Sequence, residues 1–337
     1  MAREAAKDKP APQVSVLIVA FESGTHLPRC LDALAAQTYS DFEVIVLDNG
    51  SQDRAAQAAA THDPGIRLIE AGENLGFAAG MNRAAKAAEG TWLALLNPDA
   101  FAAPDWLERL AAASVTYPKV RCFSSRQLCA QTSGRLDGLG DVMSLSGFPY
   151  RGGFGGVDPG PVAPGWVFSA CGGAMLIERD LFLSLGGFDE RLFCYCEDVD
   201  LGYRLRLKGE PTLVVPDAVV EHVGGTASGG PRSDFAVFHG TRNRLWVYVK
   251  DTPPVLLWLT LPLHILATVT LFARHATRGE FAAPWRGLMA GLAGLSIALA
   301  ARREAQAGRT VGSWAIAKAM TWNPLDLLLR RVVIQRK

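Results

Sequence analysis

One short apolar run that ends in a polar triplet most constrains how this chain of 337 residues folds. Residues 93–96 read Leu-Ala-Leu-Leu, and Asn97, Pro98 and Asp99 follow directly. This pattern predicts a buried strand that stops at the proline, which cannot donate to a sheet ladder. Asp99 is then expected at the carboxyl edge of the sheet, where open α/β folds bind ligands and a carboxylate suits Mg²⁺ or Mn²⁺. A simple turn without chemistry also fits these residues alone.

Apolar, β-branched runs upstream of this strand alternate with segments of helical periodicity. We expect strands at residues 14–20, 42–47, 66–69 and 92–96, and helices at residues 26–37, 55–61 and in an alanine-rich segment that ends at Ala88. Such alternation predicts an α/β fold with a Rossmann-like, mostly parallel sheet flanked by helices. The sequence has neither a G-x-G-x-x-G turn after its first strand nor a phosphate loop of the G-x-x-x-x-G-K-[ST] type. A dinucleotide site is therefore disfavoured.

Phosphate binding in such a fold would have to come from a cation and from the turn that carries Gly76 and Gly80. The helix after this turn, which includes Asn82, could direct backbone N–H groups at an anion. Helix packing explains these glycines equally well.

Composition excludes several classes of protein. The net charge of +1 gives no global field that would attract nucleic acid. The six cysteines form no C-x-x-C pair, so the sequence indicates neither a zinc site nor a disulfide framework, and reduced thiols are the simplest interpretation. Residues 1–12 are charged and lack the apolar segment of a signal peptide, so we expect a disordered leader.

The middle of the chain contains a cluster of acids. An amphipathic helix over residues 101–117 and an irregular functional loop or lid over residues 118–167 are expected first. Glu197, Asp198 and Asp200 then lie within four positions of one another. Acids favour the first turn of a helix, which suits Asp200 because we expect a helix over residues 201–208. Glu197 and Asp198 would precede that helix and could point into a cleft.

Two motifs follow the acids. His222 lies in an apolar context after an expected strand at residues 212–215, where a histidine is usually structural but can also bind Mn²⁺ beside a carboxylate. Arg242, Asn243 and Arg244 are expected to open the next helix. Arginine can bind phosphate oxygens in a bidentate manner, and a stacked or surface role is equally consistent with the sequence.

The C-terminal residues 251–337 predict a hydrophobic, membrane-associating helical tail. Residues 252–273 carry no charge and exceed the ~20 residues that span a bilayer. Basic residues flank the shorter apolar stretch 287–301 on both sides, which favours a re-entrant or in-plane pair over two spans. Residues 314–337 suit a helix that lies at the interface. A buried helix of a soluble domain is the alternative for the first stretch.

Five motifs in the same order as in a known family carry a resemblance. Residues 14–250 resemble an inverting family 2 glycosyltransferase of the GT-A fold, and are most similar to its rhamnosyltransferase-like and galactofuranosyltransferase-like members. The matching segments are Ser15–Val19, Cys30–Gln37, Val46–Asp53, Asn74–Ala78 and Leu96–Asp99. The resemblance implies a GT-A domain over residues 13–250, with a nucleotide-sugar half at 13–100 and an acceptor half at 101–250.

The resemblance also implies roles for single residues. Glu197 and Asp198 match the family's E-D pair, whose second acid is the general base, and Asp99 matches the metal-binding end of its D-x-D motif. Asn97 stands where that motif has its first acid, and His222 matches a metal-binding histidine of some members. The residues that the resemblance places around the nucleotide sugar are Phe21, Glu22, Asp48, Asn49, Gly76, Asn82, Asn97 and Asp99, with Phe21 and Glu22 in place of the usual Tyr-Asn pair.

The function implied is metal-dependent, inverting hexosyl transfer at the cytoplasmic face of the cell membrane, with Mg²⁺ or Mn²⁺ as cofactor. The donor would be dTDP-L-rhamnose or a UDP-sugar, and the acceptor a hydroxyl of a lipid-linked or growing cell-surface glycan. One alternative is a degenerate membrane-attached sugar-binding subunit, although Asp99 and Asp198 are both present. Another is a sugar-phosphate nucleotidyltransferase, although residues 21–25 lack the glycine-rich, arginine-bearing loop of that class.

Overall fold

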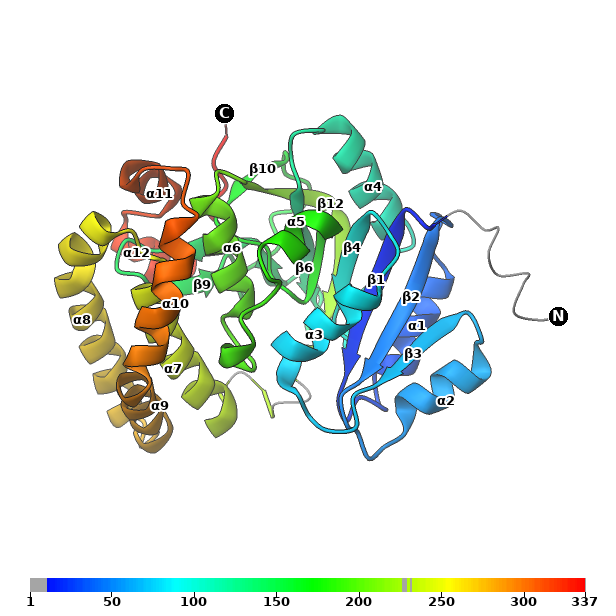
Figure 1. Ribbon diagram of the computed structural model, residues 1–337, viewed down its shortest axis with the longest axis horizontal. Coiled ribbons are helices and arrows are strands. Elements are labelled where there is room, and N and C mark those ends of the chain that lie inside the picture. Colours follow the sequence, from blue (N-terminus) through cyan, green and yellow to red (C-terminus); the bar gives the residue numbers. More distant parts are fainter. Residues whose placement is uncertain (1–10, 226–228, 231, 337) are drawn as a thin grey trace.

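A mixed β-sheet runs through one part of the molecule, and a set of helices covers one end of it (Figure 1). The computed structural model describes residues 11–225, 229–230 and 232–336. Most of the predicted leader at residues 1–12 therefore lies outside the described residues. The strand order is β10-β12-β6-β11-β4-β1-β2-β3, with β5 paired to β12 and β7 to β6.

The first part of the chain builds the parallel half of the sheet. Its elements are β1 (Val14–Ala20), α1 (Leu27–Ala35), β2 (Phe42–Asp48), α2 (Ala55–His62), β3 (Ile66–Glu70), α3 (Gly76–Ala87) and β4 (Trp92–Leu96). β1 pairs in parallel with β2 and β4, and β2 with β3. All seven residues of β1 are buried because apolar clusters cover both faces of the sheet. The predicted α/β class is confirmed, and the bounds of β1 and β4 are those expected.

The second part of the chain extends the sheet through antiparallel pairing. Its elements are β5 (Ala100–Ala102), α4 (Trp106–Thr116), β6 (Cys122–Cys129), β7 (Leu136–Leu139), β8 (Asp141–Met143), β9 (Pro149–Arg151), β10 (Gly165–Val167), β11 (Ala174–Glu178), α5 (Arg179–Ser184), the 3₁₀ turn η1 (Glu190–Leu192), α6 (Glu197–Leu207) and β12 (Thr212–His222). β11 lies between β4 and β6 and is antiparallel to both. It joins the two parts of the chain into one sheet.

Several sequence expectations for this part were wrong. Residues 100–102 are a strand on β12 rather than the start of a helix, and α4 begins only after Pro104. Residues 118–167 contain five strands rather than an irregular loop. Four of them have only three or four residues, which is too short for a recognisable periodicity. Helix α6 begins at Glu197, so both acids of the pair lie in its first turn instead of before it.

The C-terminal helices pack along α7 (Asp234–Asp251). Because α7 begins at Asp234, Arg242–Arg244 lie in its middle, and the expectation that they open a helix was wrong. α9 (Ala282–Ala293) and α10 (Leu295–Ala307) meet at an angle of 62°. A Cβ at Gly287 would lie 2.5 Å from the backbone oxygen of Phe238, so this close approach requires glycine. The guanidinium of Arg302 donates to the carbonyls of Val249 and Thr252, at 2.6 Å each. The tail is thus folded against the helix that ends the preceding segment.

Helix α8 (Pro254–Ala276) differs from α9 and α10 because little of it is covered. Among the described residues, α8 is the one unbroken helix long and apolar enough to cross a membrane, and 17% of its most apolar window is buried. At the tail end, α11 (Ser313–Ala319) and α12 (Pro324–Leu328) replace the single helix expected over residues 314–337. The chain is interrupted by the Asn323–Pro324 cap and returns to the sheet, where Gln335 pairs with Trp166.

Candidate functional site

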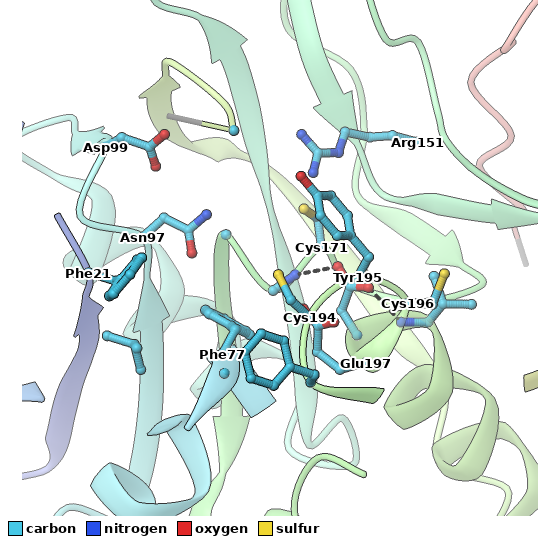
Figure 2. Close-up of a pocket in the computed structure, with 18 of the residues that line it drawn as sticks. Phe21, Phe77, Asn97, Asp99, Arg151, Cys171, Cys194, Tyr195, Cys196 and Glu197 are labelled. Atoms are coloured by element: carbon cyan, nitrogen blue, oxygen red, sulfur yellow. Dashed lines mark hydrogen bonds between the residues drawn. The ribbon is translucent and has the colours of Figure 1, made fainter. Parts of the chain in front are cut away.

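A cavity of about 620 Å³ opens where the two parts of the sheet meet (Figure 2). One side is formed by residues that follow the parallel strands, including Phe21, Asn49, Asn97 and Asp99. The other side is formed by the loop before α6, by the start of α6 and by the β8–β9 hairpin. A concave site at the carboxyl ends of parallel strands is the usual ligand site of an open α/β sheet. Of the predicted site residues, those that line the cavity are Phe21, Asn49, Gly76, Asn97, Asp99, Glu197, Asp198 and His222.

Glu22, Asp48 and Asn82 do not line the cavity, and the first two instead hold neighbouring turns. The carboxylate of Asp48 accepts hydrogen bonds from the backbone N–H of Ser51 at 3.1 Å and from the amide of Gln57 at 3.0 Å. Glu22 accepts from the backbone of Gln52 at 2.9 Å.

The side chain of Asn82 is buried and forms hydrogen bonds within the protein. Its amide donates to the carbonyl of Phe188 and to Glu190, at 2.9 Å each, and its oxygen accepts from the N–H of Phe188. The structure therefore places Asn82 as a link between α3 and the segment before η1.

A hydrogen-bonded relay connects Asp99 to two other strands. His222, at the end of β12, has its Nε2 3.2 Å from an oxygen of Asp99 and its Nδ1 2.8 Å from an oxygen of Asp137. All three side chains are buried. Burial opposes the charge on His222, but its hydrogen bonds with Asp137 and Asp99 outweigh that effect and raise its pKa to about 9. Two carboxylates thus stabilise a positive charge between them.

The acid pair at the start of α6 occupies the other side of the cavity. Asp198 accepts hydrogen bonds from the backbone N–H groups of Gly172 at 3.0 Å and Val199 at 2.8 Å. These two bonds fix the orientation of the Asp198 carboxylate. Burial, and then the charge of Asp198, raise the pKa of Glu197 well above its usual value. The two neighbouring acids therefore lie in different environments.

Arg151, Asp137 and Asp141 are site residues that the sequence analysis did not single out. Arg151 lies on β9, lines the cavity and pairs with Asp137. Burial opposes its charge, but Cys171 and the surrounding carboxylates, among them Asp198, raise its pKa above its usual value. Arg151 therefore links the His222 relay with the acid pair. Its signal in the sequence was weak, because it lies among short strands.

The loop between η1 and α6 is strained and is held from two sides. Phe193, Tyr195 and Cys196 have φ values of +65°, +71° and +67°, which cost non-glycine residues of the order of 1–2 kcal/mol each. Gly76 makes room for this loop, since a Cβ there would lie 2.5 Å from the Phe193 ring.

Asn243 on α7 anchors the same loop. Its fully buried amide nitrogen lies 2.9, 2.9 and 2.7 Å from the carbonyls of Leu192, Cys194 and Tyr195. Strained backbone persists where the surroundings over-determine it, and such segments cluster at functional sites. The anchor sets the path of the loop that leads into Glu197 and Asp198.

We expect Asn243→Ala to loosen this loop. Loss of a buried hydrogen-bond donor costs about 1–3 kcal/mol, so backbone amides of residues 193–198 should exchange with deuterium roughly tenfold to hundredfold faster. Hydrogen–deuterium exchange with mass spectrometry measures this effect. Asn323→Ala removes another asparagine, the cap of α12, and should leave the loop unchanged. Equal exchange at residues 193–198 in Asn243→Ala and the original chain would rule out the anchor.

Comparisons with known proteins agree with this geometry. The family model described as "Glycosyl transferase family 2" matches residues 15–182. The N-acetylglucosaminyl-diphospho-decaprenol L-rhamnosyltransferase of Mycobacterium tuberculosis is 31% identical over 250 residues, which cover 66% of this chain and 80% of that protein. The O-antigen biosynthesis protein RfbC of Myxococcus xanthus is 31% identical over 80% of this chain, but the match covers only 22% of RfbC.

Solved structures with the same fold are more distant in sequence. GalNAc-T7 with UDP, GalNAc and Mn²⁺ has a TM-score of 0.56 at 19% identity, over 72% of this chain and 51% of that one. Staphylococcus aureus TarS has a TM-score of 0.53 at 16% identity, over 75% of this chain and 43% of that one. This chain thus spans about half the length of each, and the likeness shows a GT-A-like fold. The rhamnosyltransferase match and the family model together show that the chain belongs to glycosyl transferase family 2.

Proposed function

We propose that this enzyme transfers a sugar, with inversion, from a nucleoside-diphosphate sugar to a hydroxyl of a lipid-linked or growing cell-surface glycan. The observation that carries the proposal is one cavity with the ionisable Asp198 on one side and the Asp99–His222 pair on the other. The mycobacterial relative is named as an L-rhamnosyltransferase that acts on a diphospho-decaprenol glycan. This name favours dTDP-L-rhamnose as donor, with a UDP-sugar as the alternative.

The donor is proposed to lie against the parallel half of the sheet. Phe21, Asn49 and Gly76 line this part of the cavity, and Asn49 is fixed by hydrogen bonds with Asn74 and the N–H of Leu75, both at 3.0 Å. The nucleoside would lie near Phe21 and Asn49, and the diphosphate near Asn97 and Asp99. Asp48 would act here by shaping the turn after β2, and a direct contact with the nucleoside stays a prediction.

The residues around Asp99 fit a divalent cation. With the proton of His222 donated from Nδ1 to Asp137, the Nε2 lone pair faces the Asp99 carboxylate across 3.2 Å. A cation between Asp99 and His222 would be bound by both acceptors, and a carboxylate that accepts from the other ring nitrogen commonly orients a metal-binding histidine. Mg²⁺ or Mn²⁺ held by Asp99 and His222 would supply Lewis-acid charge to the departing diphosphate. Within the described residues no group of three His, Cys, Asp or Glu side chains could hold a metal, so phosphate oxygens of the donor would complete the site.

Asp198 is the proposed general base. A sugar hydroxyl becomes an effective nucleophile when a positioned carboxylate takes its proton during attack, which is worth about 10²–10⁴-fold in rate. The backbone N–H groups of Gly172 and Val199 orient this carboxylate. Glu197 lies beside it, and because burial raises the pKa of Glu197, we propose that it contacts the acceptor as a hydrogen-bond donor. Attack from the side of Asp198, opposite the leaving diphosphate, inverts the anomeric carbon.

The tail is proposed to hold the enzyme at the cytoplasmic face of the membrane. The exposed apolar side chains of α8 include Val255, Trp258, Leu259, Ile265, Leu266 and Val269. Trp285, Trp314 and Trp322 of the neighbouring helical region are also exposed. Tryptophan favours the headgroup level, and an apolar helical face can lie in the interface. This surface would bring the cavity to a lipid-linked acceptor.

We expect Asp198→Asn to reduce turnover at least hundredfold and to leave donor affinity nearly unchanged, because the base acts on the acceptor. Turnover with dTDP-L-rhamnose or UDP-sugars and donor affinity should be measured on the same preparation. Asp180→Asn is the matched control, because Asp180 is an exposed acid in the first turn of α5. Activity of Asp198→Asn within tenfold of the original enzyme would contradict the assignment.

We expect Asp99→Ala to abolish the Mn²⁺-dependent part of nucleotide binding, and His222→Ala to weaken it less, since imidazole lacks the carboxylate's charge. Titration of Mn²⁺ against bound nucleotide measures both effects. Asp105→Ala, a change to a surface acid of the α4 cap, serves as the control. Unchanged metal dependence in both site variants would exclude this cation site.

We expect the triple variant Trp258→Ser, Leu259→Ser, Leu266→Ser to lose most binding to phospholipid vesicles at unchanged melting temperature, because these side chains are 71%, 71% and 63% exposed. At ~25 cal/mol per Å² of apolar surface, removing three such groups forfeits several kcal/mol of insertion free energy. Vesicle flotation measures the loss. The paired control is Val115→Ser with Val157→Ser, which are 80% and 73% exposed outside the tail. Equal flotation of the triple variant and the original enzyme would refute the proposed surface.

A further inference from the structure

Arg244 is a partly buried cation whose guanidinium has no anionic partner among the described residues. The guanidinium carbon lies 4.1 Å from the centre of the Phe148 ring, and within residues 11–225, 229–230 and 232–336 no hydrogen bond or ion pair engages it. Its neighbour Arg242 does bond, to the carbonyl of Leu192 at 3.0 Å and to Asn243 at 2.8 Å. Burial lowers the pKa of Arg244 to about 10. The five N–H donors of this partly buried guanidinium are therefore available to a ligand.

Arg244 lies between the acid pair and helix α8. Its charge acts on the thiol of Cys196, the residue directly before Glu197 and Asp198. Phe148, beneath the guanidinium, has its ring centre 5.2 Å from that of His264 on α8. One turn further along α7, Tyr248 stacks on the same histidine at 3.9 Å. Arg244 therefore lies between the start of α6 and the packed ring contacts that hold α8.

The same face of α7 has room beside Arg244. Gly240 lies one turn earlier, so it shares this face. A Cβ at Gly240 would meet no atom within 4 Å. The unpaired cation is thus next to open space rather than closed in by neighbouring side chains.

We propose that Arg244 binds the phosphate group that joins the acceptor sugar to its lipid. This inference rests on the proposed function, in which the acceptor hydroxyl reaches Asp198 while the lipid lies at α8. A guanidinium fork matches two phosphate oxygens, which makes arginine well suited to such a linkage. The donor's diphosphate belongs to the other side of the cavity, since Asp99 lies across from Cys196 and Glu197 (Figure 2). Arg244 therefore serves the acceptor, not the donor.

The test measures binding of geranyl diphosphate to the full-length protein in detergent by calorimetry. Saturating dTDP and UDP with Mn²⁺ block the donor site. We expect Arg244→Gln to weaken binding at least tenfold, Arg244→Lys to weaken it less, and Arg286→Gln, a change to an exposed cation of α9, to leave it unchanged. Geraniol, which lacks phosphate, should bind all four proteins equally. Gly240→Leu fills the space beside Arg244 without altering charge, and should also weaken the binding of geranyl diphosphate.

Three results would overturn the proposal. The first is that the original protein does not bind geranyl diphosphate. The second is that folded Arg244→Gln and Arg244→Lys bind it as tightly as the original protein does. The third is weaker binding of Arg244→Gln to phosphatidylglycerol vesicles with geranyl diphosphate unaffected, which would assign the arginine to a membrane headgroup. Failure of the proposed function is read separately, as absence of transfer from any nucleotide sugar, because this binding assay needs no donor.

Discussion

The antiparallel insertion of β11 between β4 and β6 is the constraint on which the site depends. Ala174 stands opposite Leu96 in this pairing, and the N–H of Asn97 donates to the carbonyl of Gly173 at 3.0 Å. Gly172 is therefore held at the floor of the cavity, where its N–H can orient Asp198 from another part of the chain. Without that pairing, the parallel half of the sheet would carry Asp99, but Gly172 would not be in place to hold Asp198 across the cavity.

Charge is distributed unevenly across the cavity, and this division gives the two sides different chemistry. On the Asp99 side, two carboxylates surround one histidine and favour a cation. On the Asp198 side, burial and the charge of Asp198 raise the pKa of Glu197 well above its usual value. Environments that push neighbouring acids apart in pKa are a general way to obtain an acid and a base at one pH. Arg151 lies between the two sides, and its positive charge reduces the repulsion between Asp137 on one side and Asp198 on the other.

Helix α7 connects the catalytic part to the tail. Its Asn243 holds the strained loop before α6, and Arg302 of α10 caps the carbonyls at its C-terminal end. α9 approaches α7 so closely that a Cβ at Gly287 would lie 2.5 Å from the carbonyl oxygen of Phe238. The boundary expected at residue 250 stays a prediction, but the contacts across it mean that the tail supports the helix that anchors the loop. The packing of the tail and the position of the loop before Glu197 and Asp198 are therefore linked through α7.

The sequence by itself determined the parallel α/β half and the acids at its edge. β1, β4 and Asp99 were predictable because buried strands of five or more apolar residues, closed by turn residues, depend on local pattern alone. Asp198 was found through a motif, since its spacing from Glu197 is also local.

Only the tertiary structure decided which side chains complete the site. Asp137 meets His222 across 85 positions of sequence, and Asn243 meets Tyr195 across 48. Asp137 and Arg151 lie on strands of three or four residues, whose existence depends on pairing partners far along the chain rather than on their own periodicity. The start of α6 at Glu197 is likewise set by the anchored loop before it. Contacts between distant segments leave no signal in local spacing, because the free energy that forms them comes from burial and pairing in the finished fold.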